Sequence, residues 1–199
     1  VAPVANLTVS DSQVYEDNSV ALNVSSTPAG PTQQVTITIS GILPGWSVDT
    51  SVSGATYDPA TGTWTLTAPV GQPITTGPIV APPANSDADM PNLSVNLSVT
   101  DTANGLTSTL TGTINVITDA VIDAPSINIA DNGSNEIIGT EDVDTPLNIT
   151  VSRGGDTLDN SEVLSNITIA GVPAGFTLSA GSYNATTGLW TLTTAELVG

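Results

Sequence analysis

Apolar and polar residues alternate along most of residues 1–118, which is the pattern of β-strands that turn one face to a core. The strongest alternation predicts seven strands, at residues 6–10, 19–25, 34–40, 47–52, 63–67, 93–100 and 106–117. Asn104-Gly105 lies between the last two and favours a hairpin turn, because both residues tolerate positive φ. No helical segment interrupts these runs. The chain is therefore expected to be all-β, an antiparallel β-sandwich of the Ig-like or cadherin-like kind.

The chain also repeats itself. Three segments recur later in the same order: 36–46 as 166–176, 57–67 as 183–193, and Glu16-Asp17 as Glu141-Asp142. Three collinear matches indicate tandem repeats of one structural module. The second copy has no counterpart of residues 74–118. We therefore expect tandem sandwiches: a complete repeat at 1–118, a calcium-binding linker at 119–124, and a second repeat at 125–199 that is truncated and lacks the last strands.

Composition narrows the classes of function. The chain has 19 Asp+Glu against 1 Lys+Arg, no His and no Cys, for a formal net charge of -18. Without His and Cys there is no Ser-His-Asp triad, no cysteine nucleophile and no zinc site of the usual ligands. A single cation, Arg153, cannot form a phosphate-binding surface, so we expect no nucleic acid partner. No apolar run reaches the roughly 18 residues that suggest a membrane span, so no membrane insertion is expected.

The predicted strand order brings acidic residues together. In an up-and-down course of seven strands, the first, third and fifth connections lie at the same end as the exit linker. These segments carry six carboxylates: Glu16, Asp17, Asp87, Asp89, Asp119 and Asp123. Two carboxylates about 4 Å apart repel by roughly 1 kcal/mol in water and about 4 kcal/mol at an effective dielectric of 20. With so few cations in the chain, such a cluster needs a bound counter-charge.

Calcium fits this requirement, because it is a hard cation that takes about 6–8 oxygen ligands, whereas magnesium keeps several of its waters. We therefore predict Ca²⁺ at the junction with the following repeat. Equivalent ligands in the second copy are Glu141, Asp142 and the nearby Asp144. Three further acids of the second copy can add to the junction: Asp156, Asp159 and Glu162. The alternative is that the acids only keep the surface solvated.

Several of these segments resemble the tandem extender repeats of giant RTX-type bacterial surface adhesins. They are Glu16-Asp17, residues 83–89, 41–46 and 62–67, and the junction Asp123-Ala124-Pro125. The resemblance implies a secreted, cell-surface stalk of Ig-like or cadherin-like modules, stiffened by calcium between neighbouring repeats, in a protein of cell adhesion and biofilm formation. It covers the first repeat and the surviving part of the second. The glycine-rich calcium repeats and the ligand-binding tip of that family are absent, so the adhesion target is not indicated.

Other functions stay open at this point. A structural subunit of a surface filament or S-layer would complete the second repeat with strands from a neighbouring chain. A carbohydrate-binding module would need exposed aromatic rings, for which Trp46, Trp64 and Trp190 are the candidates, although their shared repeat positions favour buried roles. Glycoside hydrolysis by two aspartates would need an apolar cleft that raises one carboxyl pKa. The acids here lie in linker-facing loops, so no enzyme is expected.

Overall fold

The computed structural model describes residues 2–130, 137–154 and 162–196, and the chain divides into two compact units. Unit 1 is Val1–Val121 and unit 2 is Ile122–Gly199. The division between Val121 and Ile122 falls within the segment 119–124, which was predicted as the linker. None of the helices in the described part of the chain is long and apolar enough to cross a membrane.

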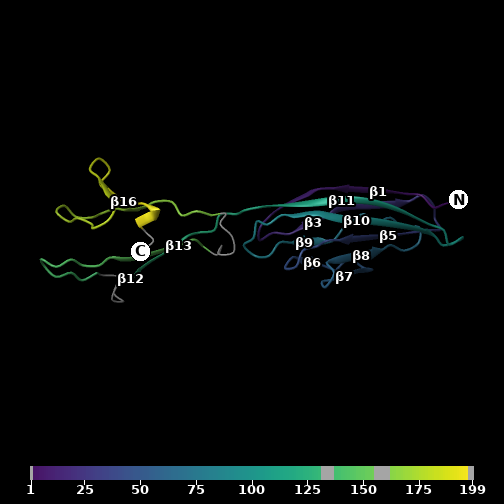
Figure 1. Cartoon of the computed structure of the whole chain (residues 1–199), viewed down its shortest axis with the longest axis horizontal. Helices are drawn as coiled ribbons and strands as arrows, with labels where there is room; N and C mark the ends of the chain where they lie inside the picture. Colours follow the sequence, from purple (N-terminus) through teal and green to yellow (C-terminus); the bar gives the residue numbers. More distant parts are fainter. Residues whose placement is uncertain (1, 131–136, 155–161, 197–199) are drawn as a thin grey trace. The chain divides into compact units, whose positions relative to one another are not determined.

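Unit 1 consists of β-strands joined by turns. In chain order the strands are β1 (Ala5–Ser10), β2 (Ser12–Tyr15), β3 (Val20–Ala21), β4 (Asn23–Pro28), β5 (Gln33–Ser40), β6 (Ser47–Asp49), β7 (Ala55–Asp58), β8 (Thr63–Thr67), β9 (Ile79–Ala81), β10 (Met90–Asp101) and β11 (Thr107–Asp119). The largest sheet has the order β2-β11-β10-β5-β8-β7, and two smaller sheets have the orders β3-β9-β6 and β1-β4. Figure 1 shows the long strands β10 and β11 running beside β1 and β5.

The core of unit 1 lies between these layers, because the strands alternate as their sequence requires. Along β10, Leu93, Val95, Leu97 and Val99 are buried while the residues between them face outward. β5 and β8 add further buried side chains on the same face, and Val24 and Val80 come from the opposing layer. The all-β sandwich expected from the alternation is confirmed for this unit.

The structure corrects the predicted strand list. It adds β7 and β9, so β8 runs opposite to the direction expected for residues 63–67. The first predicted strand continues beyond Asp11 as β2, which pairs in parallel with β11, an exception to the expected antiparallel arrangement. The two added strands reverse the chain twice, so the connection 82–89 still returns to the end of unit 1 where residues 16–19 lie.

Unit 2 reproduces only part of this architecture. Its strands are β12 (Ser126–Ala130), β13 (Asn148–Ser152), β14 (Ile167–Ile169), β15 (Ser182–Asn184) and β16 (Leu189–Leu192), followed by the 3-10 turn η1 (Thr194–Glu196). β12 pairs with β13, and a second sheet has the order β14-β16-β15. The described part of unit 2 has no strand in the place of β10 or β11, and each of its residues for which burial is described keeps some solvent exposure.

The repeat seen in the sequence extends to the pairing of the strands. In unit 1 Ile39 of β5 faces Trp64 of β8, and in unit 2 Ile169 of β14 faces Trp190 of β16. The order β5-β8-β7 corresponds to β14-β16-β15 in the same register. The two copies therefore share their local structure and differ in the strands that surround it.

Candidate functional site

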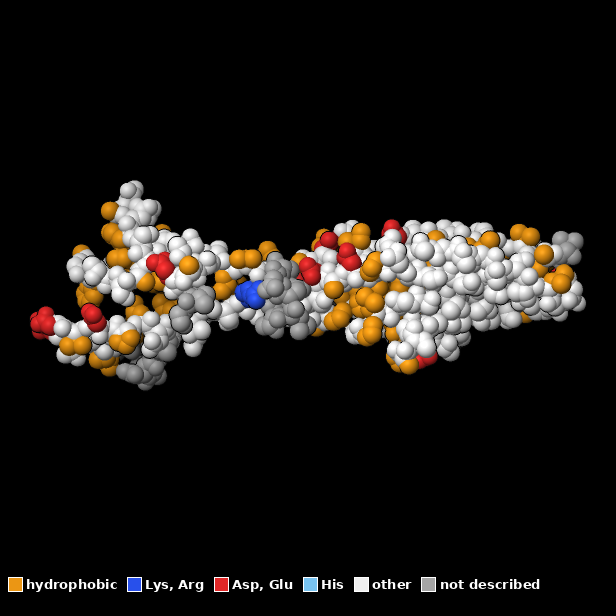
Figure 2. All heavy atoms as spheres, viewed as in Figure 1, with side chains coloured by type: hydrophobic (Ala, Val, Ile, Leu, Met, Phe, Trp, Pro, Cys, Tyr) orange, Lys and Arg blue, Asp and Glu red, His pale blue; other side chains and the backbone are white. Residues whose placement is uncertain are grey.

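The predicted ligand residues of unit 1 lie at the end where the chain leaves this unit. Glu16 and Asp17 follow β2, Asp87 and Asp89 precede β10, and Asp119 ends β11. β2 runs parallel to β11, and β11 runs antiparallel to β10, so the ends of β2 and β11 and the start of β10 lie at one end. Figure 2 shows acidic side chains at this end, whereas most of the visible surface of unit 1 is uncharged. We call the five acidic residues of this end the exit cluster.

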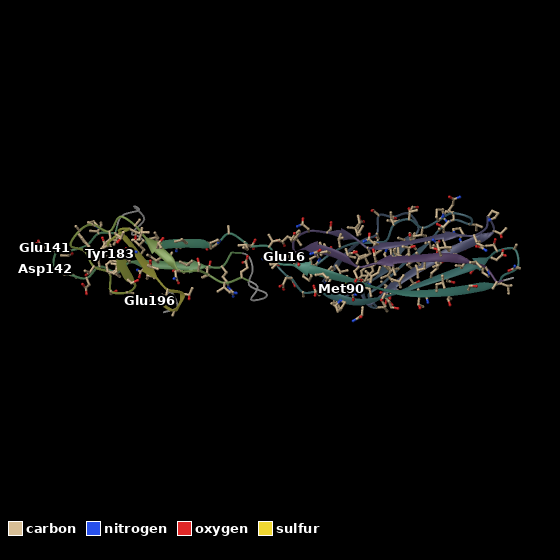
Figure 3. The ribbon with its side chains drawn as sticks, turned by 90° about the horizontal axis from the view of Figure 1, so that it is seen from above. Glu16, Met90, Glu141, Asp142, Tyr183 and Glu196 are labelled. Atoms are coloured by element: carbon tan, nitrogen blue, oxygen red, sulfur yellow. The ribbon has the colours of Figure 1, made fainter. Side chains whose placement is uncertain are left out.

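Glu16 is the buried member of the exit cluster, with 2% of its surface exposed (Figure 3). Its backbone N–H donates to the carbonyl oxygen of Asp119 at 3.0 Å, and its Oε1 accepts from the backbone N–H of Val121 at 2.5 Å. A buried carboxylate requires such partners, because burial removes its hydration shell and only hydrogen bonds within the protein can compensate for this loss. Glu16 therefore fastens the segment that leaves β11 to the connection between β2 and β3.

Two exposed aspartates make similar links between segments. Asp17 has φ 62° and accepts through Oδ1 from the backbone N–H of Asn85 at 3.2 Å. Asp89 accepts through Oδ1 from the backbone N–H of Thr118 at 2.8 Å. The left-handed φ of Asp17 is tolerated by aspartate better than by most residues. The first bond connects the 16–19 turn to the 82–89 connection. The second connects the 82–89 connection to the end of β11.

The remaining members complete the exit cluster. Asp119 is half-buried, and its Oδ2 accepts a hydrogen bond from Nε2 of Gln13 in β2. Asp87 is also half-buried, in the connection before β10. The structure thus brings Glu16, Asp17, Asp87, Asp89 and Asp119 to one end, as the sequence predicted. The backbones of Glu16 and Asp119 bond to each other, and the side-chain bonds described above reach neighbouring strands and turns.

The donor set of the exit cluster suits calcium, but its arrangement is not that of a closed site. All its side-chain ligands are carboxylate oxygens, the type that a hard cation prefers. Nowhere in the described residues do three or more acidic side chains lie close enough together to hold a metal ion. Asp17 and Asp89 each direct one oxygen to a backbone amide, and a carboxylate has two. Calcium binding would therefore require the exposed turns to close around the ion.

The predicted ligands of unit 2 fall into two places. Asp123 donates its backbone N–H to Oε1 of Glu162, whose carbonyl oxygen accepts from Nη1 of Arg153 at 3.1 Å. Glu141, Asp142 and Asp144 are exposed, in the connection that precedes β13. Figure 3 shows Glu141 and Asp142 side by side at the tip of this connection. Two other acids considered for the junction, Asp156 and Asp159, lie outside the described residues.

Asp142 keeps the backbone conformation of its counterpart, with φ 63° against 62° for Asp17. Glu141, in contrast, is exposed where Glu16 is buried. The partners of Glu16 come from the end of β11 and the residues after it, and the described part of unit 2 has no equivalent strand. The same local sequence therefore has a turn in both units and a buried carboxylate only in unit 1.

The aromatic candidates for a sugar-binding surface also differ in burial between the two units. Trp46 and Trp64 are buried in the core of unit 1, so neither indole offers a face to a sugar ring. Trp190 is half-buried beside Tyr183, with ring centroids 5.4 Å apart. The expectation of a buried aromatic is confirmed for Trp64 and is wrong for Trp190, because no strand in the described part of unit 2 takes the place of β10 or β11.

One acidic residue that the sequence reasoning passed over also organises unit 1. Oδ1 of Asp11 accepts from the backbone N–H of Asn115 at 2.8 Å and from its Nδ2 at 3.1 Å. This holds β11 at the point where the chain passes from β1 to β2. The signal in the sequence is the break in alternation at Ser10-Asp11-Ser12-Gln13, which was read as the end of a strand.

Neither a protein-family model nor a curated protein sequence matches this chain. Among solved structures, AggA, the major subunit of aggregative adherence fimbriae type I from Escherichia coli, is similar at 10% identity over 59% of this chain and 94% of that chain, with a TM-score of 0.35. The seventh ScaB type I cohesin from Pseudobacteroides cellulosolvens is similar at 5% identity over 59% and 93%, with a TM-score of 0.38.

The CsuC-CsuE chaperone-tip adhesion subunit complex from Acinetobacter baumannii is similar at 9% identity over 97% of this chain and 86% of that chain, with a TM-score of 0.29. At these identities and TM-scores the likenesses assign neither a family nor a function to the chain. The functional argument therefore depends on the residues of the chain itself.

Proposed function

We propose that this chain is a calcium-stabilised extender segment of a bacterial cell-surface adhesin of the RTX type. Outside the cell it would project a distal binding region in adhesion and biofilm formation, with neighbouring repeats of the same chain as its partners. The observation that supports this proposal is the exit cluster: five acidic residues from three separate segments at the end of unit 1. The chain has one Lys+Arg residue to balance 19 Asp+Glu.

Calcium would act on the free energy of unfolding of unit 1. A ligand that binds only the folded state adds RT ln(1 + [L]/Kd), which is about 2.7 kcal/mol at a hundred times Kd. In the exit cluster Asp17, Asp87 and Asp89 belong to connections rather than strands, so they can move toward an ion without breaking a sheet. Glu16 and Asp119 would supply oxygens from the fixed side of the same site.

The test compares thermal unfolding of the full chain with calcium and with EGTA. Calcium should raise the Tm of unit 1 by several degrees, and magnesium should have a much smaller effect. The double variant Asp17→Asn with Asp89→Asn should abolish the shift. The matched control is Asp49→Asn, an exposed aspartate outside the exit cluster whose carboxylate is bonded within its own turn after β6. Equal melting with and without calcium would refute the calcium part of the proposal.

A stalk must also be stiff, and calcium should supply part of this stiffness where the chain leaves unit 1. If calcium fastens residues 119–121 to the exit cluster, the full chain should give a narrower distribution of interatomic distances in small-angle scattering with calcium. Asp89→Asn with Asp119→Asn should lose this change while the β-sheet signal in circular dichroism stays. If calcium raises the Tm but leaves the scattering profile unchanged, calcium binds the chain but does not stiffen it.

No observation favours a carbohydrate-binding module, because Trp46 and Trp64 are buried.

A further inference from the structure

Two strands that lie far apart in the sequence of unit 1 run side by side in the same direction. β2 pairs in parallel with β11, from Ser12 opposite Val116 to Tyr15 opposite Asp119. The other strand pairs described in this unit are antiparallel. The chain enters unit 1 through β1, which leads into β2, and leaves it after β11 at the opposite end (Figure 1). The parallel pair therefore joins the entering part of the chain to the leaving part.

This arrangement determines how tension acts on the pair. When the chain is pulled from both sides of unit 1, β2 is drawn toward its own N-terminal end and β11 toward its own C-terminal end. In a parallel pair these two directions are opposite, so the strands are sheared along their length. A sheared ladder loads all its hydrogen bonds at the same time, whereas a ladder pulled apart at one end loads them one after another. The β2–β11 pair therefore shares one force among many bonds.

A side-chain network extends the pair at the end where β2 begins. Oδ1 of Asp11 accepts from the backbone N–H of Asn115 at 2.8 Å and from its Nδ2 at 3.1 Å. Oδ1 of Asn115 accepts in turn from the backbone N–H of Asn92, in β10, at 3.0 Å. Asp11 thus connects the entering part of the chain to β11 and, through Asn115, to β10.

Three further bonds extend the pair at the end where β2 stops. Nε2 of Gln13 donates to Oδ2 of Asp119, and the backbone N–H of Glu16 donates to the carbonyl oxygen of Asp119 at 3.0 Å. Oε1 of Glu16 accepts from the backbone N–H of Val121 at 2.5 Å, beyond the last residue of β11. We call residues 11–16 and 115–121, joined by these bonds and by the ladder, the terminal-strand clamp.

The inner face of the terminal-strand clamp is closed to water. The side chains that it turns to the core are buried, with between 0% and 6% of their surface exposed: Ser12, Val14, Glu16, Val116 and Thr118. Hydrogen bonds in such surroundings are electrostatically stronger than in water. Water also has little access from this side to replace a bond that opens briefly under load. Burial therefore adds to the resistance that the direction of the strands provides.

We propose that the terminal-strand clamp is the element by which unit 1 withstands tension along the chain. Its rupture is the step that limits the extension of unit 1, and the remaining strands separate after it at lower force. This role goes beyond the proposed calcium site, because every bond of the clamp is made within the protein. The resistance is therefore expected in EGTA.

The experiment stretches single molecules of the full chain in EGTA along two directions. The chain has no cysteine, so one introduced cysteine fixes a point of attachment. The first geometry holds the two ends of the chain, and the second holds Ser19→Cys and the C-terminal end. Ser19 is exposed and follows β2 at the end where β11 leaves unit 1. The second geometry therefore pulls the clamp apart from one end, and unit 2 is stretched in both.

The two geometries should give different rates of extension for the same folded unit. Forced unfolding is governed by the unfolding rate. At equal constant force we expect unit 1 to extend at least about tenfold more slowly in the first geometry, where the bonds are sheared together. Each event should lengthen the chain by roughly 350 Å, close to the extended reach of unit 1 between the points of attachment. Equal rates in the two geometries would overturn the proposal.

A matched pair of variants tests the side-chain part of the clamp. Asp101 accepts from the backbone N–H of Ala103 at 3.0 Å and from Nδ2 of Asn104 at 2.9 Å. It thus makes the same kinds of bond as Asp11, but within the turn between β10 and β11. In the first geometry, Asp11→Ala should speed extension by about tenfold, because bonds that share the load are lost. Asp101→Ala should change this rate by no more than about twofold.

The second geometry separates a mechanical role from a general effect on stability. Asp11→Ala should speed extension much less there, because the bonds near Glu16 break first. An equal acceleration in both geometries would mean that Asp11 stabilises unit 1 without resisting tension, and the role given to it would be wrong. If Asp11→Ala does not fold, the comparison of the two geometries in the chain with Asp11 still decides the proposal. Equal melting with and without calcium would leave these results unchanged, so the two proposals fail separately.

Discussion

Trp64 and Trp190 occupy the same position of the repeat and have different environments. Each lies opposite an isoleucine in the paired strand and beside a tyrosine in the next strand, Tyr57 or Tyr183. Trp64 is nevertheless fully buried while Trp190 is half-buried. Local sequence is therefore enough to set turns and register, whereas burial depends on strands that come from elsewhere in the chain.

The same contrast holds at the other repeated aromatic position. Trp46 is buried in unit 1, and its counterpart Phe176 is 69% exposed. The glycines on either side of the preceding turn keep positive φ in both units, at 96° and 92° in unit 1 and at 76° and 93° in unit 2. The turn thus forms without a core beneath it. Substitutions at paired positions measure how much the burial of a repeated residue contributes to the stability of each unit.

The largest difference is expected between Trp64→Ala and Trp190→Ala. Truncating a fully buried aromatic typically costs about 3–5 kcal/mol, because contacts are lost and a cavity is left. Trp190 gives up much less burial, so its truncation should lower the free energy of unfolding by only about 1 kcal/mol. Urea unfolding of each variant, followed by circular dichroism and by NMR signals of each unit, measures both values. Equal costs would show that unit 2 has a core like that of unit 1 in solution.

A smaller difference is expected between Gly62→Ala and Gly188→Ala. Both glycines have positive φ, 61° and 70°, so alanine is strained at either position. A Cβ at Gly62 would also lie 2.2 Å from the carbonyl oxygen of Ile42, while nothing lies within 4 Å of one at Gly188. We expect Gly188→Ala to lower the free energy of unfolding by about 1 kcal/mol, and Gly62→Ala to lower it by at least about twice as much. If thermal melts show the same decrease in Tm for both variants, the close approach at Gly62 has no effect on stability and the comparison is wrong.

The third comparison uses the paired glutamates. Glu16→Ala removes a buried carboxylate that accepts from the backbone N–H of Val121, which should lower the free energy of unfolding by about 1–3 kcal/mol. Glu141→Ala changes an exposed residue, so it should alter stability by no more than about 0.5 kcal/mol. Amide exchange at Val121, measured in EGTA, reports the lost bond directly. Unchanged exchange in Glu16→Ala would contradict the role given to this carboxylate.

The sequence was informative about strands and loop positions and less so about burial. Alternation predicted the strands at 34–40 and 93–100, because long runs of period two have no other reading. It missed Ala55–Asp58 and Ile79–Ala81, which are short and depend on pairing with β8 and with β3 and β6. The exit cluster was placed at one end despite these errors, since two missed strands restore the direction of the chain.

Two features of the candidate site were beyond a reading of local sequence. Glutamate is seldom fully buried, and Glu16 is buried only because residues 119–121 fold back onto it. The half-burial of Trp190 follows from the strands that the described part of unit 2 does not contain. Both depend on contacts between residues far apart in sequence, which a repeat match cannot show when one copy is shorter than the other.

The smallest effect is expected at Glu196, in the turn that closes the β14-β16-β15 sheet. Its carboxylate accepts from the backbone N–H and the Oγ1 of Thr193, both at 2.8 Å, and from the backbone N–H of Gly181 at 2.9 Å. The bond from the Thr193 backbone N–H to the Glu196 carboxylate is one half of a capping box, while the backbone N–H of Glu196 donates to the carbonyl oxygen of Thr193. The Thr193 bonds, with a further contribution from Gly181, hold the pKa of Glu196 below the ordinary value of a glutamate carboxyl.

A carboxyl whose pKa is lowered by folding stabilises the folded form at pH values above its unfolded pKa, and the contribution is lost as the pH falls through the folded pKa. The ends of β15 and β16 should therefore loosen on acidification below the usual glutamate range. NMR signals of the Gly181 and Thr193 amides should titrate with the Glu196 carboxyl, and Glu196→Gln should remove this titration while the signals of unit 1 stay unchanged. If both amides titrate equally in Glu196→Gln, another group controls this turn, and the capping bonds do not set its stability.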